Sequence, residues 1–166
     1  GNQQKVQFII SILNNPKLIA KLEEKRVILE FKLHPIFEGY KDLFDFKSKN
    51  VVLSCEEVNL AKYKMFITDF SSFQFDFIKY NRPILYFLPD RLEFKGGLHS
   101  YSNLDLKYED AFGDLYLEPE KLVERIIKEI DSDFKNSPKY SSRMNKFFFA
   151  EKDHREVLYK NLIKIK

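Results

Sequence analysis

The chain has 166 residues, enough for one domain with a substantial buried core. Its 28 basic and 25 acidic residues leave a net charge of only +3, spread along the chain, which argues against a nucleic-acid-binding protein. No apolar run approaches the roughly 18 residues of a membrane-spanning helix, and the first residues do not form a signal peptide. A single cysteine, Cys55, excludes an intramolecular disulfide and indicates a reducing compartment such as the cytoplasm.

The first part of the chain alternates predicted helices with predicted strands. Apolar residues at helical spacing predict an amphipathic helix that ends near Leu13, and Pro16 is placed to begin a second helix. The apolar segment 27–33 predicts a strand that ends at His34–Pro35, where the proline holds His34 in an extended conformation. The next predicted elements are a short helix over 36–46, a strand over 51–55 and a short helix over 58–63.

The second part of the chain continues this alternation. A buried strand over 65–68 leads through a tight turn into a helix that begins at Ser71, where Gln74 completes a capping box. We expect residues 91–113 to form a long loop of the kind that often carries function. The other predicted elements are strands over 84–88 and 115–117 and helices over 119–130, over 138–149 and from 153. Strands separated by helices predict parallel pairing with right-handed crossovers, and therefore an α/β fold with an open parallel sheet and flanking helices.

Candidate ligand-binding residues follow the predicted strands. Open α/β sheets bind ligands beyond the carboxyl ends of their strands, which is where His34, Asp69 and Asp90 stand. The helix start at Ser71–Ser72 offers backbone N–H groups and two hydroxyls, a combination that binds phosphate or pyrophosphate. Plainer structural roles remain alternatives. These are a helix cap for Ser71, a loop histidine for His34, turn formers for Asp69 and Asp90, a solvated helix face for Asp76 and a surface position for His99.

Several familiar chemistries lack their sequence patterns. Gly96–Gly97 does not have the spacing of a dinucleotide or Walker loop, and no nucleophile elbow of the G-x-S-x-G type is present. Three scattered histidines and one cysteine do not compose a metal cluster. We therefore expect neither a resident cofactor nor a metal.

Five short motifs in register resemble one family of bacterial enzymes. They are Lys-Leu-His-Pro at 32–35, Phe-Ile-Thr-Asp-Phe-Ser-Ser at 66–72, Phe-Asp-Phe at 75–77, Arg-Pro-Ile at 82–84 and Tyr-Phe-Leu-Pro-Asp at 86–90. Together they resemble the CDP-glycerol glycerophosphotransferase family, the teichoic-acid and capsule polymerases and primases of bacteria. The resemblance extends through essentially the whole chain.

The resemblance implies a GT-B architecture of two Rossmann-like domains, in which residues 1–166 are the single C-terminal nucleotide-binding domain of a larger transferase. That enzyme would move glycerol phosphate, or a related phosphoalditol, from CDP-glycerol to teichoic acid or capsule at the inner face of the cell membrane, without a metal. His34 would be catalytic, either positioning phosphate or shuttling a proton. The implied donor-binding residues are Thr68, Asp69, Ser71, Ser72 and Asp76, with Asp90 and His99 as further candidates.

Two departures from the family pattern affect these expectations. The P-T-W-R motif and the acceptor domain are absent, so this chain alone is expected not to turn over, and acceptor binding and peripheral membrane attachment would come from other segments. The usual R-G-[FY] pattern after Asp90 is replaced by Lys-Gly-Gly-Leu-His-Ser-Tyr at 95–101. A GT-B glycosyltransferase that uses a nucleotide-diphosphate sugar and a non-catalytic Rossmann-like binding domain therefore remain alternatives.

Overall fold

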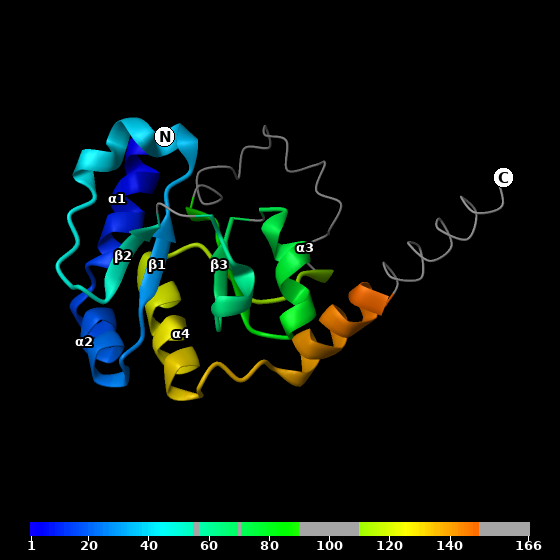
Figure 1. Cartoon of the computed structure of the whole chain (residues 1–166). Helices are drawn as coiled ribbons and strands as arrows, with labels where there is room; N and C mark the ends of the chain where they lie inside the picture. The colour runs from blue at the N-terminus through cyan, green and yellow to red at the C-terminus, as the bar shows by residue number, and fades with distance from the viewer. Residues whose placement is uncertain (55–56, 70, 90–109, 150–166) are drawn as a thin grey trace, which may run out of the picture.

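A computed structural model describes residues 1–54, 57–69, 71–89 and 110–149 (Figure 1). Cys55, Asp90 and His99 lie outside these ranges, as does the helix predicted from 153. No helix in the described part of the chain combines the length and the apolar character needed to cross a membrane.

The strands form the middle layer of the described structure, and all of their pairings are parallel. β1 (Leu29–Lys32) pairs with β2 (Val51–Ser54). β4 (Ile84–Phe87) lies between β3 (Phe66–Thr68) and β5 (Leu115–Tyr116). The predicted α/β class and the five strand positions are confirmed. Main-chain hydrogen bonds divide the strands into a two-stranded and a three-stranded sheet.

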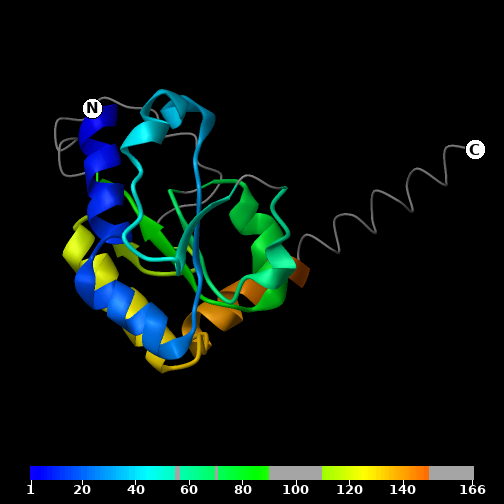
Figure 2. The same cartoon turned by 60° about the vertical axis from the view of Figure 1, so that its left-hand side comes forward.

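Helices cover both faces of this layer (Figures 1 and 2). One face packs under α1 (Asn2–Leu13), α2 (Pro16–Lys25) and α4 (Pro119–Asp131). The other face packs under α3 (Phe73–Phe77) and the helix 138–149. Short 3₁₀ helices complete the described elements: η1 (Pro35–Leu43), η2 (Leu60–Lys62) and η3 (Ile78–Tyr80).

The central strand β4 is buried at every residue. Leu85 and Phe87 belong to the core under α1, α2 and α4, whereas Ile84 and Tyr86 belong to the core under α3 and the helix 138–149. Successive side chains of a strand point to opposite faces, so a parallel strand covered on both sides becomes continuously apolar. β4 therefore joins the two cores.

The first two helices begin and end as the sequence predicts. Asn15 caps α2, because its side-chain oxygen accepts hydrogen bonds from the backbone N–H groups of Lys17 and Leu18 at 3.0 and 3.2 Å. Pro16 occupies the first helical position, where a missing N–H costs nothing. The helices predicted over 36–46 and 58–63 are present as η1 and η2, in 3₁₀ rather than α geometry.

The capping box predicted at Ser71 is wrong. Gln74 is buried, and its side-chain oxygen accepts a hydrogen bond from the hydroxyl of Tyr86 instead of reaching back to the helix start. The helix itself is short, since α3 contains 5 residues and continues as the 3₁₀ turn η3. Packing of Gln74 against the sheet has overridden the local capping pattern.

Candidate functional site

The carboxyl ends of β1 and β3 share a rim with the beginning of α1. In Figure 1, α1 begins and η1 lies at the end toward which the β1 arrow points. Lys5 of α1 connects the rim, because its Nζ lies 3.6 Å from Oδ2 of Asp69 and 5.9 Å from the centre of the Phe37 ring in η1. The Phe37 ring centre lies 6.4 Å from that of His34. The structure thus brings the regions of His34 and Asp69, predicted to be neighbours, to one rim.

Side-chain hydroxyls accept hydrogen bonds from backbone N–H groups in the turn 68–72, in which Phe70 lies outside the described residues. Oγ1 of the buried Thr68 accepts a hydrogen bond from the Ser71 N–H at 3.0 Å, and Oγ of Ser71 accepts one from the Phe73 N–H at 3.4 Å. A hydroxyl that accepts an N–H keeps its own proton for donation. Ser71 is half-buried and Ser72 is exposed, so neither residue is closed off from solvent.

His34 is extended, as the following proline predicts, with φ −68° and ψ 141°. Its Nδ1 accepts a hydrogen bond from the Ile36 N–H at 3.2 Å, which caps η1, and the residue is exposed. Because Nδ1 accepts, the proton of the neutral imidazole lies on Nε2. In this arrangement His34 presents a hydrogen-bond donor to the solvent.

Lys32, at the end of β1, lies near the start of α3. Its Nζ lies 5.7 Å from the centre of the half-exposed Phe73 ring, at the start of α3. Sequence reasoning missed both Lys32 and Lys5. A signal for Lys32 was available, since residues 32 and 34 of an extended segment point to the same side. For Lys5 there was none, because its place depends on how α1 docks.

The remaining predicted residues are distributed as follows. Asp76 is exposed in the first turn of α3, which agrees with a solvated helix face. Asp90 and His99 lie outside the described residues. Within the described ranges, no three side chains of His, Cys, Asp or Glu are grouped so that they could hold a metal ion.

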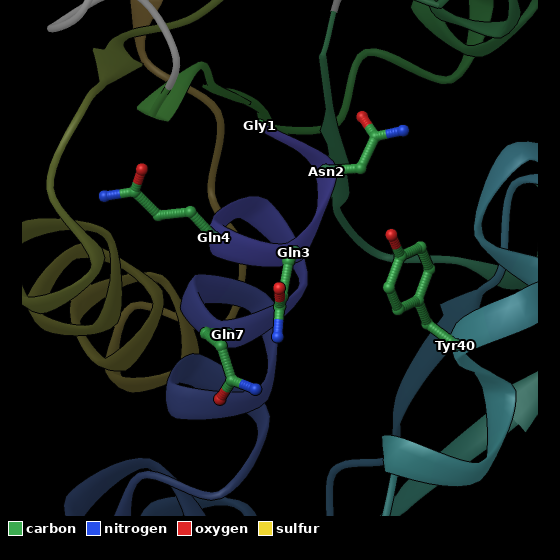
Figure 3. Close-up of a pocket in the computed structure, with 6 residues that line it drawn as sticks. All are labelled: Gly1, Asn2, Gln3, Gln4, Gln7 and Tyr40. Atoms are coloured by element: carbon green, nitrogen blue, oxygen red, sulfur yellow. The ribbon is translucent and has the colours of Figure 1, made fainter.

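An open hollow of about 620 Å³ lies beside the beginning of α1 (Figure 3). Figure 3 shows Tyr40 of η1 facing α1 across it. The residues that line it are Gly1, Asn2, Gln3, Gln4, Gln7 and Tyr40. Its side chains are amides and a phenol, and none of the predicted site residues belongs to it. The hollow therefore adds neutral hydrogen-bonding groups beside the rim.

A buried hydrogen bond joins α3 to the central strand β4. The Tyr86 hydroxyl donates to Oε1 of Gln74 at 2.7 Å and accepts from the Phe112 N–H at 3.2 Å. Burial raises the pKa of Tyr86 to about 12, and the Phe112 N–H opposes part of that rise. The position of the first turn of α3, and with it the end of the turn 68–72, thus depends on a hydroxyl in the core.

Comparison with known proteins bears on the family and the fold of this chain. The model of the family described as CDP-Glycerol:Poly(glycerophosphate) glycerophosphotransferase matches residues 2–164. The chain is similar to the minor teichoic acid biosynthesis protein GgaB of Bacillus subtilis (strain 168), with 24% identity over 162 residues that cover 93% of this chain and 17% of that protein. It is also similar to the wall teichoic acid polymerase TagF, with a TM-score of 0.54 and 17% identity, over 90% of this chain and 39% of the solved chain.

The likeness to TagF shows the fold, which is the α/β arrangement described above. This chain spans less than half the length of either relative. The family match extends over nearly all of its residues, and it agrees with the resemblance carried by the motifs at 32–35 and 66–72. The chain belongs to the CDP-glycerol:poly(glycerophosphate) glycerophosphotransferase family.

Proposed function

We propose that this chain is the donor-binding part of a transferase that moves glycerol phosphate, or a related phosphoalditol, from a CDP-activated donor to teichoic acid or a capsule polymer. Membership of a glycerophosphotransferase family supports the reaction class, and the names of the relatives GgaB and TagF support a cell-surface polymer as the product. The observation that carries the proposal is the shared rim, where Lys5 contacts both Asp69 and the Phe37 ring beside His34.

In the proposed reaction, an acceptor hydroxyl attacks the phosphorus that carries the glycerol. A new P–O ester bond forms, and the P–O bond of the anhydride breaks so that CMP leaves with its electron pair. The proton of the acceptor hydroxyl passes to solvent or to a base outside this rim. Enzymes accelerate such transfers mainly by positioning the groups and by stabilising the negative charge on the phosphate oxygens.

The residues of the rim fit this task as hydrogen-bond donors. Ser71 and Ser72 would bind the diphosphate through their hydroxyls, and Thr68 would hold the turn in shape through its contact with the Ser71 N–H. Asp76, in the first turn of α3, could meet a sugar or glycerol hydroxyl, whereas Asp69 lies in the turn itself and is ion-paired with Lys5. His34 would donate from Nε2 to a phosphate oxygen, because its Nδ1 already accepts the Ile36 N–H. We therefore favour phosphate positioning over proton abstraction for His34.

We further propose that the donor is held without a metal and that the acceptor polymer binds to parts of the protein outside this chain. The second point is supported by length, since the matched region makes up 17% of GgaB and 39% of TagF. Attachment at the inner face of the cell membrane would also come from those parts.

Calorimetric titration with CDP-glycerol, CDP, UDP and CMP tests the proposal, with the protein at its full natural length and a Ser71→Ala/Ser72→Ala variant beside it. We expect a preference for cytidine that requires the diphosphate and weakens about tenfold or more in the variant. Preference for uridine, with release of a nucleoside diphosphate on turnover, would point to a sugar transferase. Equal affinity in the variant would disprove the phosphate role of the turn, and equal binding of all nucleotides would favour a non-catalytic domain.

A further inference from the structure

The turn 68–72 cannot neutralise a diphosphate by itself. The helix that follows it, α3, has 5 residues, so few peptide dipoles are aligned behind the turn. Two of the N–H groups there already donate within the protein, that of Ser71 to Thr68 and that of Phe73 to Ser71. A ligand with two or more negative charges on this rim therefore requires cationic side chains.

Two lysines flank the turn from different elements. Lys5 reaches its beginning from α1, with Nζ 3.6 Å from Oδ2 of Asp69. Lys32, at the end of β1, lies beside the first residue after the turn, with Nζ 5.7 Å from the centre of the Phe73 ring. The two ammonium groups thus stand at residues 69 and 73, with the hydroxyls of Ser71 and Ser72 between these positions in the chain.

The Lys5 side chain is largely covered and has defined neighbours on the rim. Only 15% of its side chain is exposed, and its ammonium group lies near Asp69 and the Phe37 ring of η1. Its partner Asp69 is 54% exposed, so the carboxylate side of this ion pair is open to solvent. Ordering a long lysine side chain in advance reduces the entropy that a ligand must later overcome.

We propose that Lys5 and Lys32 bind the diphosphate of the donor from the two sides of the turn, and that Asp69 positions Lys5. This inference rests on the proposed function and adds to it the groups that supply the positive charge. A diphosphate would meet ammonium groups from α1 and β1 together with hydroxyls from the turn. Asp69 would then act through Lys5 as a positioning residue rather than as a ligand of the donor.

The chain offers matched control lysines away from the rim. Lys64 makes the same two kinds of contact as Lys5, with Nζ 3.5 Å from Oδ1 of Asp133 and 5.8 Å from the Phe134 ring, but it precedes β3 instead of following it. Lys79 lies 5.2 Å from the Tyr80 ring, as Lys32 lies over Phe73, but in η3 beyond the far end of α3. Each control removes one positive charge and one ring contact.

The experiment measures the affinity of the full-length protein for CDP, its salt dependence and the free energy of unfolding. The variants are Lys5→Met, Lys32→Met, the double variant, Lys64→Met and Lys79→Met, with Lys5→Arg as the conservative replacement. We expect the affinity to fall about tenfold in each rim variant and about a hundredfold in the double variant. The loss of affinity with rising salt should be shallower in the double variant. The controls should stay within about twofold, and Lys5→Arg should recover most of the affinity.

Results other than those expected would contradict either the lysine roles or the proposed function. Equal losses in the rim and control variants would mean a general charge effect and would overturn the inference. Rim variants that bind within twofold of wild type, while Ser71→Ala/Ser72→Ala binds weakly, would overturn the lysine roles and leave the proposed function intact. If Ser71→Ala/Ser72→Ala binds CDP as wild type does, or if wild type does not bind it, the proposed function of the turn fails first.

Discussion

The hydroxyl of Tyr86 donates a hydrogen bond of 2.7 Å to Oε1 of Gln74, and both residues are buried. The bond joins the central strand β4 to the first turn of α3, next to the candidate phosphate-binding turn. The same hydroxyl accepts the Phe112 N–H at 3.2 Å, so one oxygen connects the strand, the helix and the segment that leads into β5. The position of α3, and of the rim at its start, therefore depends on hydrogen bonds in the core.

Replacing Tyr86 with phenylalanine should lower the free energy of unfolding by about 1–3 kcal/mol, because the buried Gln74 oxygen and the Phe112 N–H would lose their partner. Urea unfolding measures the change. The double variant Tyr86→Phe/Gln74→Met should lose less than the sum of the two single variants, since it removes both polar groups together. Strict additivity would show that the two side chains are not coupled.

The stability should also fall at alkaline pH. Burial raises the pKa of Tyr86 to about 12, whereas an unfolded tyrosine titrates near 10. The stabilisation by the protonated hydroxyl is thus complete below pH 10 and is lost as the pH rises toward 12. The difference in unfolding free energy between wild type and Tyr86→Phe should shrink by roughly 1–2 kcal/mol by about pH 11. A difference that stays constant from pH 8 to pH 11 would contradict this assignment.

Gly113 should not tolerate alanine. A Cβ at this position would lie 1.6 Å from the carbonyl oxygen of Ile84, which belongs to β4. The backbone of both segments would have to move, and we expect a loss of about 3 kcal/mol or more. Gly39→Ala is the control, because a Cβ at residue 39 would have no neighbouring atom within 4 Å, and its melting temperature should stay close to that of wild type. Similar melting temperatures for the two variants would show that β4 and β5 can separate without cost.

Arg125 forms an ion pair with Glu129, whose carboxylate is almost fully buried. Its Nε donates to Oε1 of Glu129 at 2.8 Å, and one of its terminal nitrogens donates to Oδ2 of Asp114 at 3.0 Å. Arg125→Met would leave Glu129, whose side chain is 7% exposed, without this partner, at a cost of about 2–4 kcal/mol. Arg125→Met/Glu129→Met should recover most of the loss. If chemical unfolding shows the double variant to be less stable than Arg125→Met, burial of the charge is not the cause.

The two ring nitrogens of His34 can be separated by substitution. His34→Asn keeps an acceptor for the Ile36 N–H but removes the outward Nε2–H, so the unfolding free energy should change by less than about 0.5 kcal/mol. Release of CMP from CDP-glycerol, measured in the full-length protein, should fall about a hundredfold or more, because a hydrogen-bond donor to the phosphate oxygens is lost. His34→Gln should keep part of the activity, because its amide can reach the position of Nε2. Full activity in His34→Asn would show that the only role of His34 is to cap η1.

The fold was predictable where periodicity and helix-start residues act locally. Pro16 and Pro119 begin their helices, and β4 is apolar throughout because both of its faces are covered. The features that the sequence did not predict depend on contacts between segments that are distant in the chain. Gln74 has the right spacing for a capping box, but a tyrosine 12 residues later binds its side chain instead. The split between β1–β2 and β3–β4–β5 likewise reflects how strands align in space, which a single segment does not encode.

The candidate site was predictable to the extent that it follows the strand ends. His34 and Asp69 could be placed because the carboxyl ends of parallel strands share one side of the sheet. Lys5 could not, since the helical pattern of α1 shows which side chains are apolar but not which polar residue meets Asp69. The residue roles at the rim stay predictions until the binding and activity measurements are made.

The burial of β4 on both faces limits how this strand can change. A shift by one residue would turn Tyr86 toward the apolar core under α1, α2 and α4, away from Gln74. Both cores would then be repacked at once, and the hydroxyl that holds α3 would be removed from it. The register of β4 therefore determines where the rim lies. A single inserted or deleted residue in this strand would displace the turn at Ser71 without altering any residue of the turn itself.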